Sequence, residues 1–373
     1  MEKSKVYFTD LRALPGTNLL KKLNNLILKA GIQEIDFTEK FAAIKIHFGE
    51  PGNLTFLRPN YSKVVADVVK SLDGKPFLTD SNTLYVGKRK NALDHLDSAF
   101  LNGFNNLSTG CNIIIADGLK GTDEAYVNVD GEYVKEAKIG HAIMDADIFI
   151  SLNHFKGHES TGFGGAMKNI GMGSASRAGK MEQHSSGKPT VKSQSCVMCG
   201  KCIKNCAHDA ISITDENVAC IDKNKCVGCG RCIGTCNYNA IYNKYSSAND
   251  ELNKKIAEYT KAVLQDRPHF HISLVIDVSP YCDCHSGNDV AIIPDVGMFA
   301  SFDPVALDQA CADMANKMPV MPNSLLSDRM ESENFHDFHD HFKNSTPSSE
   351  WKICLEHAEK IGVGTREYEL IEV

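Results

Sequence analysis

Two short cysteine runs lie near the middle of this chain and determine how that part folds. Residues 196–206 read Cys196-Val-Met-Cys199-Gly-Lys-Cys202-Ile-Lys-Asn-Cys206, and residues 226–236 read Cys226-Val-Gly-Cys229-Gly-Arg-Cys232-Ile-Gly-Thr-Cys236. The second run repeats the first after 30 positions, and residues 196–211 and 226–241 are identical at 9 of 16 positions. We interpret the repeat as two duplicated halves of one small unit.

The spacing within each run indicates its chemistry. Three thiolates on one tight loop can each reach a different iron of a cubane, and the longer gap turns the fourth thiolate toward the partner cluster. We therefore predict two [4Fe-4S] clusters with exchanged fourth ligands, suited to single-electron transfer. The ligands are Cys196, Cys199, Cys202 and Cys236 for the first cluster, and Cys226, Cys229, Cys232 and Cys206 for the second.

The same stretch, about residues 193–244, resembles bacterial two-cluster ferredoxins. The proline that usually follows the fourth cysteine is replaced by Ala207 and Asn237, which affects loop rigidity more than iron binding. The alternative is a pair of zinc sites, because C-x2-C pairs also suit tetrahedral zinc. Zinc does not need a repeated four-thiol run, so the pattern favours clusters.

Composition excludes several classes of protein. The 373 residues include 14 cysteines, and 40 Lys and Arg against 47 Asp and Glu give a net charge of −7. This acidic balance argues against a nucleic acid or an anionic membrane held through bulk charge. No apolar run approaches the ~18 residues of a membrane span. The amino terminus, Met1-Glu-Lys-Ser-Lys5, is charged and runs into a short strand-like segment, so we expect a cytoplasmic protein.

Outside the cysteine runs, short apolar strands alternate with helices. This alternation predicts an α/β fold, in which helices cover a mixed or parallel sheet. A hairpin is expected at 128–134, around Asp130-Gly131. Strands are expected at 6–11, 42–48, 77–80, 112–118, 147–152, 271–278 and 291–296, and helices at 18–30, 62–72, 92–102, 249–264, 304–314 and 351–360.

Linker-like residues at 185–189 and 246–250 flank the cysteine runs. We therefore expect one α/β domain, formed by residues 1–190 and 246–373 and interrupted by a small α+β ferredoxin-like module at 193–244. The alternative is a tandem of three domains. It is weaker because the carboxy-terminal part contains few strands for a core of its own.

A glycine-rich stretch follows the buried strand at 147–152. Seven glycines lie between Gly157 and Gly179, and Lys168, Arg177 and Lys180 add positive charge. Such a stretch lets backbone approach an anionic ligand closely. We expect a cofactor or substrate to contact it. The candidate contacts are Gly162, Gly164, Gly165 and Lys168. The alternative is a flexible connector that docks the module.

Three segments, 154–173, 282–285 and 295–308, are similar to domain of unknown function family 362. Members of that family are often described as iron–sulfur centre proteins. The resemblance covers nearly the whole chain and implies a fold and the position of the module, but no reaction.

A fainter likeness is to the nickel-pincer lactate racemases. Gly162-Phe-Gly-Gly-Ala-Met-Lys168 stands between His158 and His184 and resembles their cofactor-lysine segment, and Arg58-Pro59 resembles their substrate motif. The likeness implies His158, Lys168, His184 and Arg58 as catalytic candidates. Arg58 would clamp an anion, and either histidine would donate a proton or bind metal. The family's further histidine is replaced by the 79–82 region, which weakens an isomerase hypothesis.

Six cysteines lie outside the repeat. Cys282 and Cys284, with His285, are candidates for an accessory metal site or a redox-active thiol, against a packed turn without ligands. The remaining four, Cys111, Cys220, Cys311 and Cys354, are expected to pack in apolar surroundings. The run at 335–342 is expected to form a solvated, partly buried helix, and the alternative is a metal site at His336, His339 and His341.

The leading hypothesis is an iron–sulfur redox protein, in which the module exchanges electrons with a substrate or cofactor in a pocket of the α/β domain. The expected partners are a redox protein and a small anionic substrate, with a further metal or anionic small-molecule cofactor in the pocket. Two alternatives are an electron-transfer or scaffold protein without its own substrate, and a nickel-type isomerase with structural clusters.

Overall fold

The computed structural model describes most of the chain, and one predicted cluster ligand, Cys229, lies outside the described residues. Those residues are 3–84, 87–184, 188–204, 206, 208–226, 232, 236, 238, 240–242, 247–333 and 335–373.

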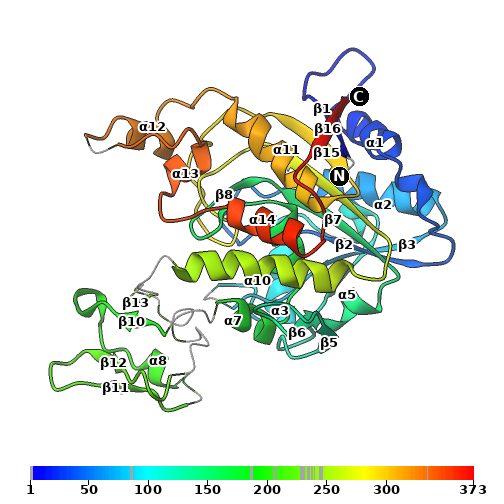
Figure 1. Cartoon of the computed structure of the whole chain (residues 1–373). Coiled ribbons are helices and arrows are strands. Elements are labelled where there is room, and N and C mark those ends of the chain that lie inside the picture. The colour runs from blue at the N-terminus through cyan, green and yellow to red at the C-terminus, as the bar shows by residue number, and fades with distance from the viewer. Residues whose placement is uncertain are drawn as a thin grey trace.

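An eight-stranded mixed sheet forms the centre of the α/β domain (Figure 1). Its strands are β1 (Ser4–Thr9), β2 (Phe41–Lys45), β3 (Lys75–Asp80), β4 (Asn112–Ile115), β7 (Ile148–His154), β14 (His269–Val275), β15 (Gly297–Ser301) and β16 (Tyr368–Glu372). Their order is β16-β1-β15-β14-β7-β2-β3-β4. Every neighbouring pair is parallel except the two that involve β15. The predicted α/β class with a mixed or parallel sheet is confirmed.

Helices cover both faces of the sheet. One face carries α1 (Leu19–Lys29), α2 (Pro59–Ser71), α3 (Ala92–Leu101) and α4 (Asn106–Thr109). The other side of the domain carries α5 (His141–Asp145), α6 (Ala166–Gly171), α7 (Arg177–His184), α10 (Ser247–Leu264), α11 (Pro304–Asn316), α12 (Leu325–Met330), α13 (His341–Ser345) and α14 (Lys352–Lys360).

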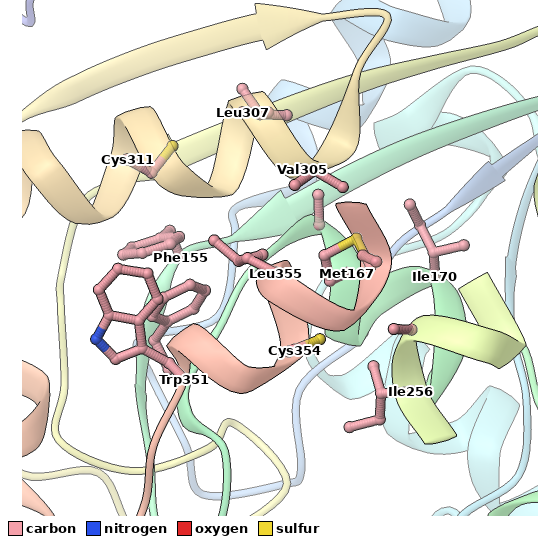
Figure 2. Close-up of a cluster of buried hydrophobic side chains, with 14 of the residues drawn as sticks. Phe155, Met167, Ile170, Ile256, Val305, Leu307, Cys311, Trp351, Cys354 and Leu355 are labelled. Carbon is pink, nitrogen blue, oxygen red and sulfur yellow. The ribbon is translucent and has the colours of Figure 1, made fainter. Parts of the chain in front are cut away.

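Each face of the sheet contributes to its own apolar core, because strand side chains alternate between faces. Ile148, Ile150 and Leu152 of β7 join the core under α1 and α2, whereas Phe149 joins the core on the other side. Figure 2 shows part of that second core, where α14 packs against α6, α10 and α11. The labelled side chains are Phe155, Met167, Ile170, Ile256, Val305, Leu307, Cys311, Trp351, Cys354 and Leu355.

Strands from both sides of the cysteine-rich segment join this one sheet. β7 and β14 are adjacent and parallel, and the connection between them carries the whole segment together with α6, α7 and α10. The segment itself contains α8 (Lys201–Lys204) and two small antiparallel pairs, β10 (Thr190–Val191) with β13 (Ile241–Tyr242) and β11 (Ile211–Ile213) with β12 (Ala219–Ile221). In Figure 1 it lies beyond α10, away from the sheet.

The hairpin predicted around Asp130-Gly131 is confirmed by an antiparallel pair of strands, β5 (Glu124–Asn128) and β6 (Glu136–Gly140). The strand predicted at 291–296 is wrong. Ile292 and Ile293 are buried in an irregular segment, and Pro294, which has no N–H to donate to a sheet, favours that outcome. The strand begins afterwards, at Gly297.

The predicted helix over the three histidines is also wrong. The described residues from 335 to 339 are not helical, and α13 begins at His341. Asp340 sets that start, because its carboxylate accepts N–H bonds from Phe342 and Lys343, both at 3.0 Å.

The prediction for Cys220 is wrong, whereas those for Cys111, Cys311 and Cys354 are confirmed as buried. Cys220 is exposed because it points away from the small core, while its neighbours Ala219 and Ile221 are buried. None of the described helices is both long and apolar enough to cross a membrane.

Candidate functional site

A deep cavity of about 670 Å³ opens at the carboxyl ends of β2, β3 and β7. Lys45 ends β2, Asp80 ends β3 and His154 ends β7, and all three line the cavity. The strand order changes direction here, because β3 and β4 follow β2 on one side whereas β14 lies beyond β7 on the other. Open α/β sheets bind ligands at such a switch point. The fold therefore places the cavity where a substrate site is expected.

One wall of the cavity is built around two thiols. Lys168 of α6 donates to Cys282, with 3.3 Å between Nζ and Sγ. Cys284 follows Cys282 by two positions, and both thiols line the cavity. Lys168 and the two cysteines come from predictions made separately for two segments more than 100 residues apart. The structure brings these segments together in one site.

Hydrogen bonds and charge set the protonation of the two thiols. The hydrogen bond with Cys284, followed by the Lys168 charge, lowers the pKa of Cys282 well below its ordinary value, against the effect of burial. The same bond with Cys282 raises the pKa of Cys284. Burial lowers the pKa of Lys168, but the two sulfurs outweigh it and raise that pKa above its usual range. The site favours a thiolate at Cys282 beside an ammonium at Lys168.

His158 faces Cys282 with a defined nitrogen. Its Nδ1 accepts backbone N–H bonds from Ser160 at 3.1 Å and Thr161 at 3.2 Å. In a neutral imidazole one nitrogen accepts and the other donates, so these bonds assign the proton to Nε2. The His158 side chain lies near Cys282 and helps to lower the pKa of that thiol. His158 is therefore placed as a donor to sulfur, which suits the proton-donor role more than the metal-ligand role.

Three further groups adjust the charge of this wall. Glu159 Oε1 lies 2.9 Å from His285 Nε2. Burial raises the pKa of Glu159, but the neighbouring His158 and the bond from His285 outweigh it and hold that pKa at about 2. The bond to Glu159 raises the pKa of His285. His184 also lines the cavity, and burial, with the Lys168 charge, lowers its pKa to about 3.

Another part of the cavity lining is rich in buried charges. Lys45 Nζ lies 2.9 Å from Asp80 Oδ1, and Arg89 Nε lies 2.9 Å from Glu50 Oε2. Arg89 Nη2 is buried and has no hydrogen-bond partner among the described residues. Burial lowers the pKa of Lys180 to about 8, with Asp117 opposing the shift. The cations Lys45, Arg89 and Lys180 could together bind an anionic group of a ligand.

The glycine-rich stretch packs mainly against protein. A Cβ at Gly165 would lie 2.2 Å from Asp308 Oδ1, and a Cβ at Gly157 would lie 2.5 Å from the Pro280 carbonyl oxygen. Gly164 and Gly165 line the cavity. Gly162, at φ +82°, instead packs against Trp351. Close packing of neighbouring elements therefore accounts for most of the glycine density.

Four predicted ligands of the first cluster line one small apolar hollow in the cysteine-rich segment. They are Cys196, Cys199, Cys202 and Cys236. Cys236 also lines the large cavity of the α/β domain. In the second set, Cys206, Cys226 and Cys232 pack around the same small core. Among the described residues, no three His, Cys, Asp or Glu side chains form a group that could hold a metal ion, at 282–285 or elsewhere.

Sequence reasoning placed some cavity residues and missed others. His158, Lys168, His184, Cys282, Cys284 and His285 all line the cavity. Arg58 does not line it. Its side chain is 61% exposed and lies 3.5 Å from Asp277. Reasoning from the sequence missed Lys45, His47, Asp80, Arg89, His154 and Lys156. Lys45, Asp80 and His154 lie at or near the carboxyl ends of predicted strands, and that position was the available signal.

Comparison with known proteins adds the family. A family model described as Domain of unknown function (DUF362) matches residues 42–313. The chain belongs to this family. The DUF362 region runs from β2 to α11 and includes both cysteine runs and the residues that line the cavity. A search of curated proteins finds no match.

Two solved structures are similar to this DUF362 chain. The lactate racemase apoprotein from Thermoanaerobacterium thermosaccharolyticum has a TM-score of 0.33 and 13% identity, over 74% of this chain and 51% of that chain. A protein from Thermotoga maritima has a TM-score of 0.36 and 12% identity, over 80% of this chain and 57% of that chain. The chain thus spans little more than half the length of these two proteins.

Proposed function

We propose that this protein binds two [4Fe-4S] clusters and exchanges single electrons with a ligand in the cavity of the α/β domain. One observation carries the proposal. Cys236 lines both the hollow shared by Cys196, Cys199 and Cys202 and the large cavity that holds Lys168. If Cys236 holds a cluster at the cavity wall, an electron would travel only a short distance between that cluster and a ligand in the cavity.

The cysteine-rich segment supplies suitable surroundings for thiolate ligands. Backbone N–H groups donate to sulfur from Ala210 to Cys206 and from Ala240 to Cys236, each at 3.3 Å. These two bonds are related by the 30-residue repeat. Hydrogen bonds to the ligand sulfurs stabilise thiolate and help set the potential of a cluster, which accepts and releases one electron at a time. The donor set and the duplicated bonds support iron–sulfur binding.

The cavity residues would hold a small anionic ligand through buried cations. Lys45, Arg89 and Lys180 line the cavity, and Lys168 lies beside the thiols. Buried cations hold an anion more strongly than exposed ones, because water screens them less. His158 Nε2 would hold a proton at the thiol wall. These residues give the α/β domain the means to bind and protonate a ligand.

The test is metal analysis of protein purified without oxygen. We expect about eight irons and eight sulfides per chain, as two [4Fe-4S] clusters require, and a visible absorption band that bleaches on reduction with dithionite. Cys236→Ser should lower iron and sulfide to about half. Cys220→Ser is the matched control, because Cys220 is exposed and stands outside the repeat, and it should keep the full complement.

Other results would redirect the assignment. About four irons or fewer in the unaltered chain, or stoichiometric zinc, would overturn the two-cluster proposal. Full clusters whose spectra do not respond to any cavity substitution, such as Lys180→Gln, would favour an electron-transfer or scaffold protein without its own substrate. Stoichiometric nickel would favour the isomerase alternative.

A further inference from the structure

The two thiols of the cavity wall are held close together by the backbone. Cys282 and Cys284 are the first and third residues of a turn, which is closed by a 3.1 Å bond from the His285 N–H to the Cys282 carbonyl. Such a turn brings residues i and i+2 close to each other. Both cysteines line the cavity. The pair is therefore accessible to a cavity ligand, with its two thiols on one turn.

The residue between the two cysteines is anchored away from them. Asp283 is fully buried, and its Oδ2 lies 2.8 Å from His154 Nδ1 and 3.4 Å from Lys156 Nζ. Its backbone carbonyl accepts the N–H of Glu50 at 3.0 Å. Asn53 also donates to the His285 carbonyl at 3.2 Å. The turn is thus held from two sides while the thiols face the cavity.

The groups that face the sulfurs are a cation and a hydrogen-bond donor. Lys168 Nζ lies 3.3 Å from Cys282 Sγ, and the His158 side chain lies near the same sulfur. Both contacts stabilise a thiolate, the reduced form of sulfur. Because His158 presents an N–H to the sulfur rather than a lone pair, the arrangement suits sulfur chemistry better than a metal ion held by Cys282 and His158.

We propose that Cys282 and Cys284 form a dithiol–disulfide couple, which stores two electrons at the cavity wall. Oxidation takes two electrons from the Cys282 thiolate and the Cys284 thiol, breaks the one S–H bond of Cys284, forms one S–S bond and releases one proton. Reduction takes two electrons, one at a time, from a low-potential one-electron donor, breaks the S–S bond and returns the proton to Cys284. The couple would convert single electrons into a two-electron step on a cavity ligand.

This inference deepens the proposed function and rests on it only for the source of electrons. Cys236 lines the same cavity as the two thiols, so electrons arriving through the cysteine-rich segment would enter beside them. The chemistry of the pair itself does not depend on iron, and it can be measured separately.

The experiment is a thiol–disulfide titration of the full chain, purified without oxygen and equilibrated with mixtures of reduced and oxidised dithiothreitol. Free thiols are alkylated after acid quenching, and mass spectrometry follows the peptide that carries Cys282 and Cys284. We expect two alkyl groups in reducing mixtures and none in oxidising ones. Cys220→Ser should leave this midpoint unchanged.

A second variant tests the role of the neighbouring cation. Lys168→Gln removes the charge that stabilises the reduced pair, so the equilibrium should move about tenfold toward the disulfide, a shift of about 30 mV for two electrons. Lys168→Arg keeps a cation and should shift the midpoint less. If Lys168 had a purely structural role, its substitution would lower the stability of the protein without moving the thiol–disulfide midpoint.

Two results would overturn the couple: two alkyl groups at every ratio of the mixture, or a bound metal that Cys284→Ser removes. Iron and sulfide counts on the same sample separate this failure from failure of the proposed function. A pair that titrates in a chain without iron would leave the couple standing and remove the electron source. As a positive link, reduced methyl viologen should reduce the disulfide faster in cluster-loaded protein than in iron-free protein.

Discussion

The α/β domain and the cysteine-rich segment have cores of different kinds. The domain buries two large clusters of apolar side chains, one on each face of the sheet. In the segment, the described core has six buried residues, of which two are Cys202 and Cys232, and four further cysteines pack around it. Burial of apolar area can stabilise the first. In the second, cysteine takes the place of larger apolar side chains, so we expect iron to supply the missing stability.

Removing iron should give the largest difference between the two regions. We expect an iron chelator under reducing conditions to abolish protection from amide hydrogen exchange across residues 188–242, because the free energy of metal binding would be the folding free energy of this segment. The α/β domain should keep its protection. Trp351, the single tryptophan, is buried in that domain, so its fluorescence should change little. Equal loss of protection in both regions would contradict the comparison.

A buried carboxyl should make the stability of the α/β domain depend on pH. Asp308 of α11 accepts N–H bonds from Ala166 at 2.7 Å and Met167 at 2.9 Å. Burial outweighs these bonds and raises its pKa from 3.8 to about 7. A carboxyl with a raised pKa binds its proton more tightly when folded, so its contribution is complete below about pH 4 and is lost as the pH rises through 7.

We therefore expect the free energy of unfolding, followed by Trp351 fluorescence, to contain a term that falls by up to about 4 kcal/mol from pH 4 to pH 7. Asp308→Asn cannot titrate and should remove this term, although it also weakens one of the two N–H bonds. If wild type and Asp308→Asn showed parallel pH profiles, the carboxyl would not be the cause.

Truncating a core side chain should destabilise the α/β domain by a somewhat smaller amount. Leu355 of α14 is 1% exposed and lies in the core of Figure 2. Leu355→Ala should lower the free energy of unfolding by about 3 kcal/mol, through lost burial and a residual cavity. Leu107→Ala, at a side chain that is 96% exposed, is the matched control and should change it by less than about 0.5 kcal/mol.

The effect of Leu355→Ala should stay within its region. Iron and sulfide content and the cluster absorption band should match those of the unaltered chain, because α14 belongs to the core of the α/β domain. Loss of iron in this variant at temperatures where Trp351 remains folded would show that the two regions are not separate in stability.

The local sequence pattern predicted most of the secondary structure. It failed where a contact with a residue elsewhere in the chain sets the end of a helix or strand. The strand at 42–48 and the helix at 304–314 follow from apolar periodicity, and the structure has β2 and α11 there. Asp340 ends the apparent helical pattern of the histidines, because it caps α13 and also accepts the Trp351 indole N–H at 2.7 Å. Nothing in the sequence pattern around Asp340 or Trp351 indicates this contact.

The sequence by itself determined the α/β class, the duplicated cysteine runs and the predicted ligand sets, because each depends on spacing along one segment. Only the tertiary structure decided which of the other reactive residues share a site. Parallel strands bring their carboxyl ends to one edge of the sheet, so Lys45, Asp80 and His154 meet in one cavity. The fold also places Lys168 beside Cys282, 114 positions away, and leaves Arg58 exposed at the surface. Spacing along the chain cannot tell which of these residues share a site.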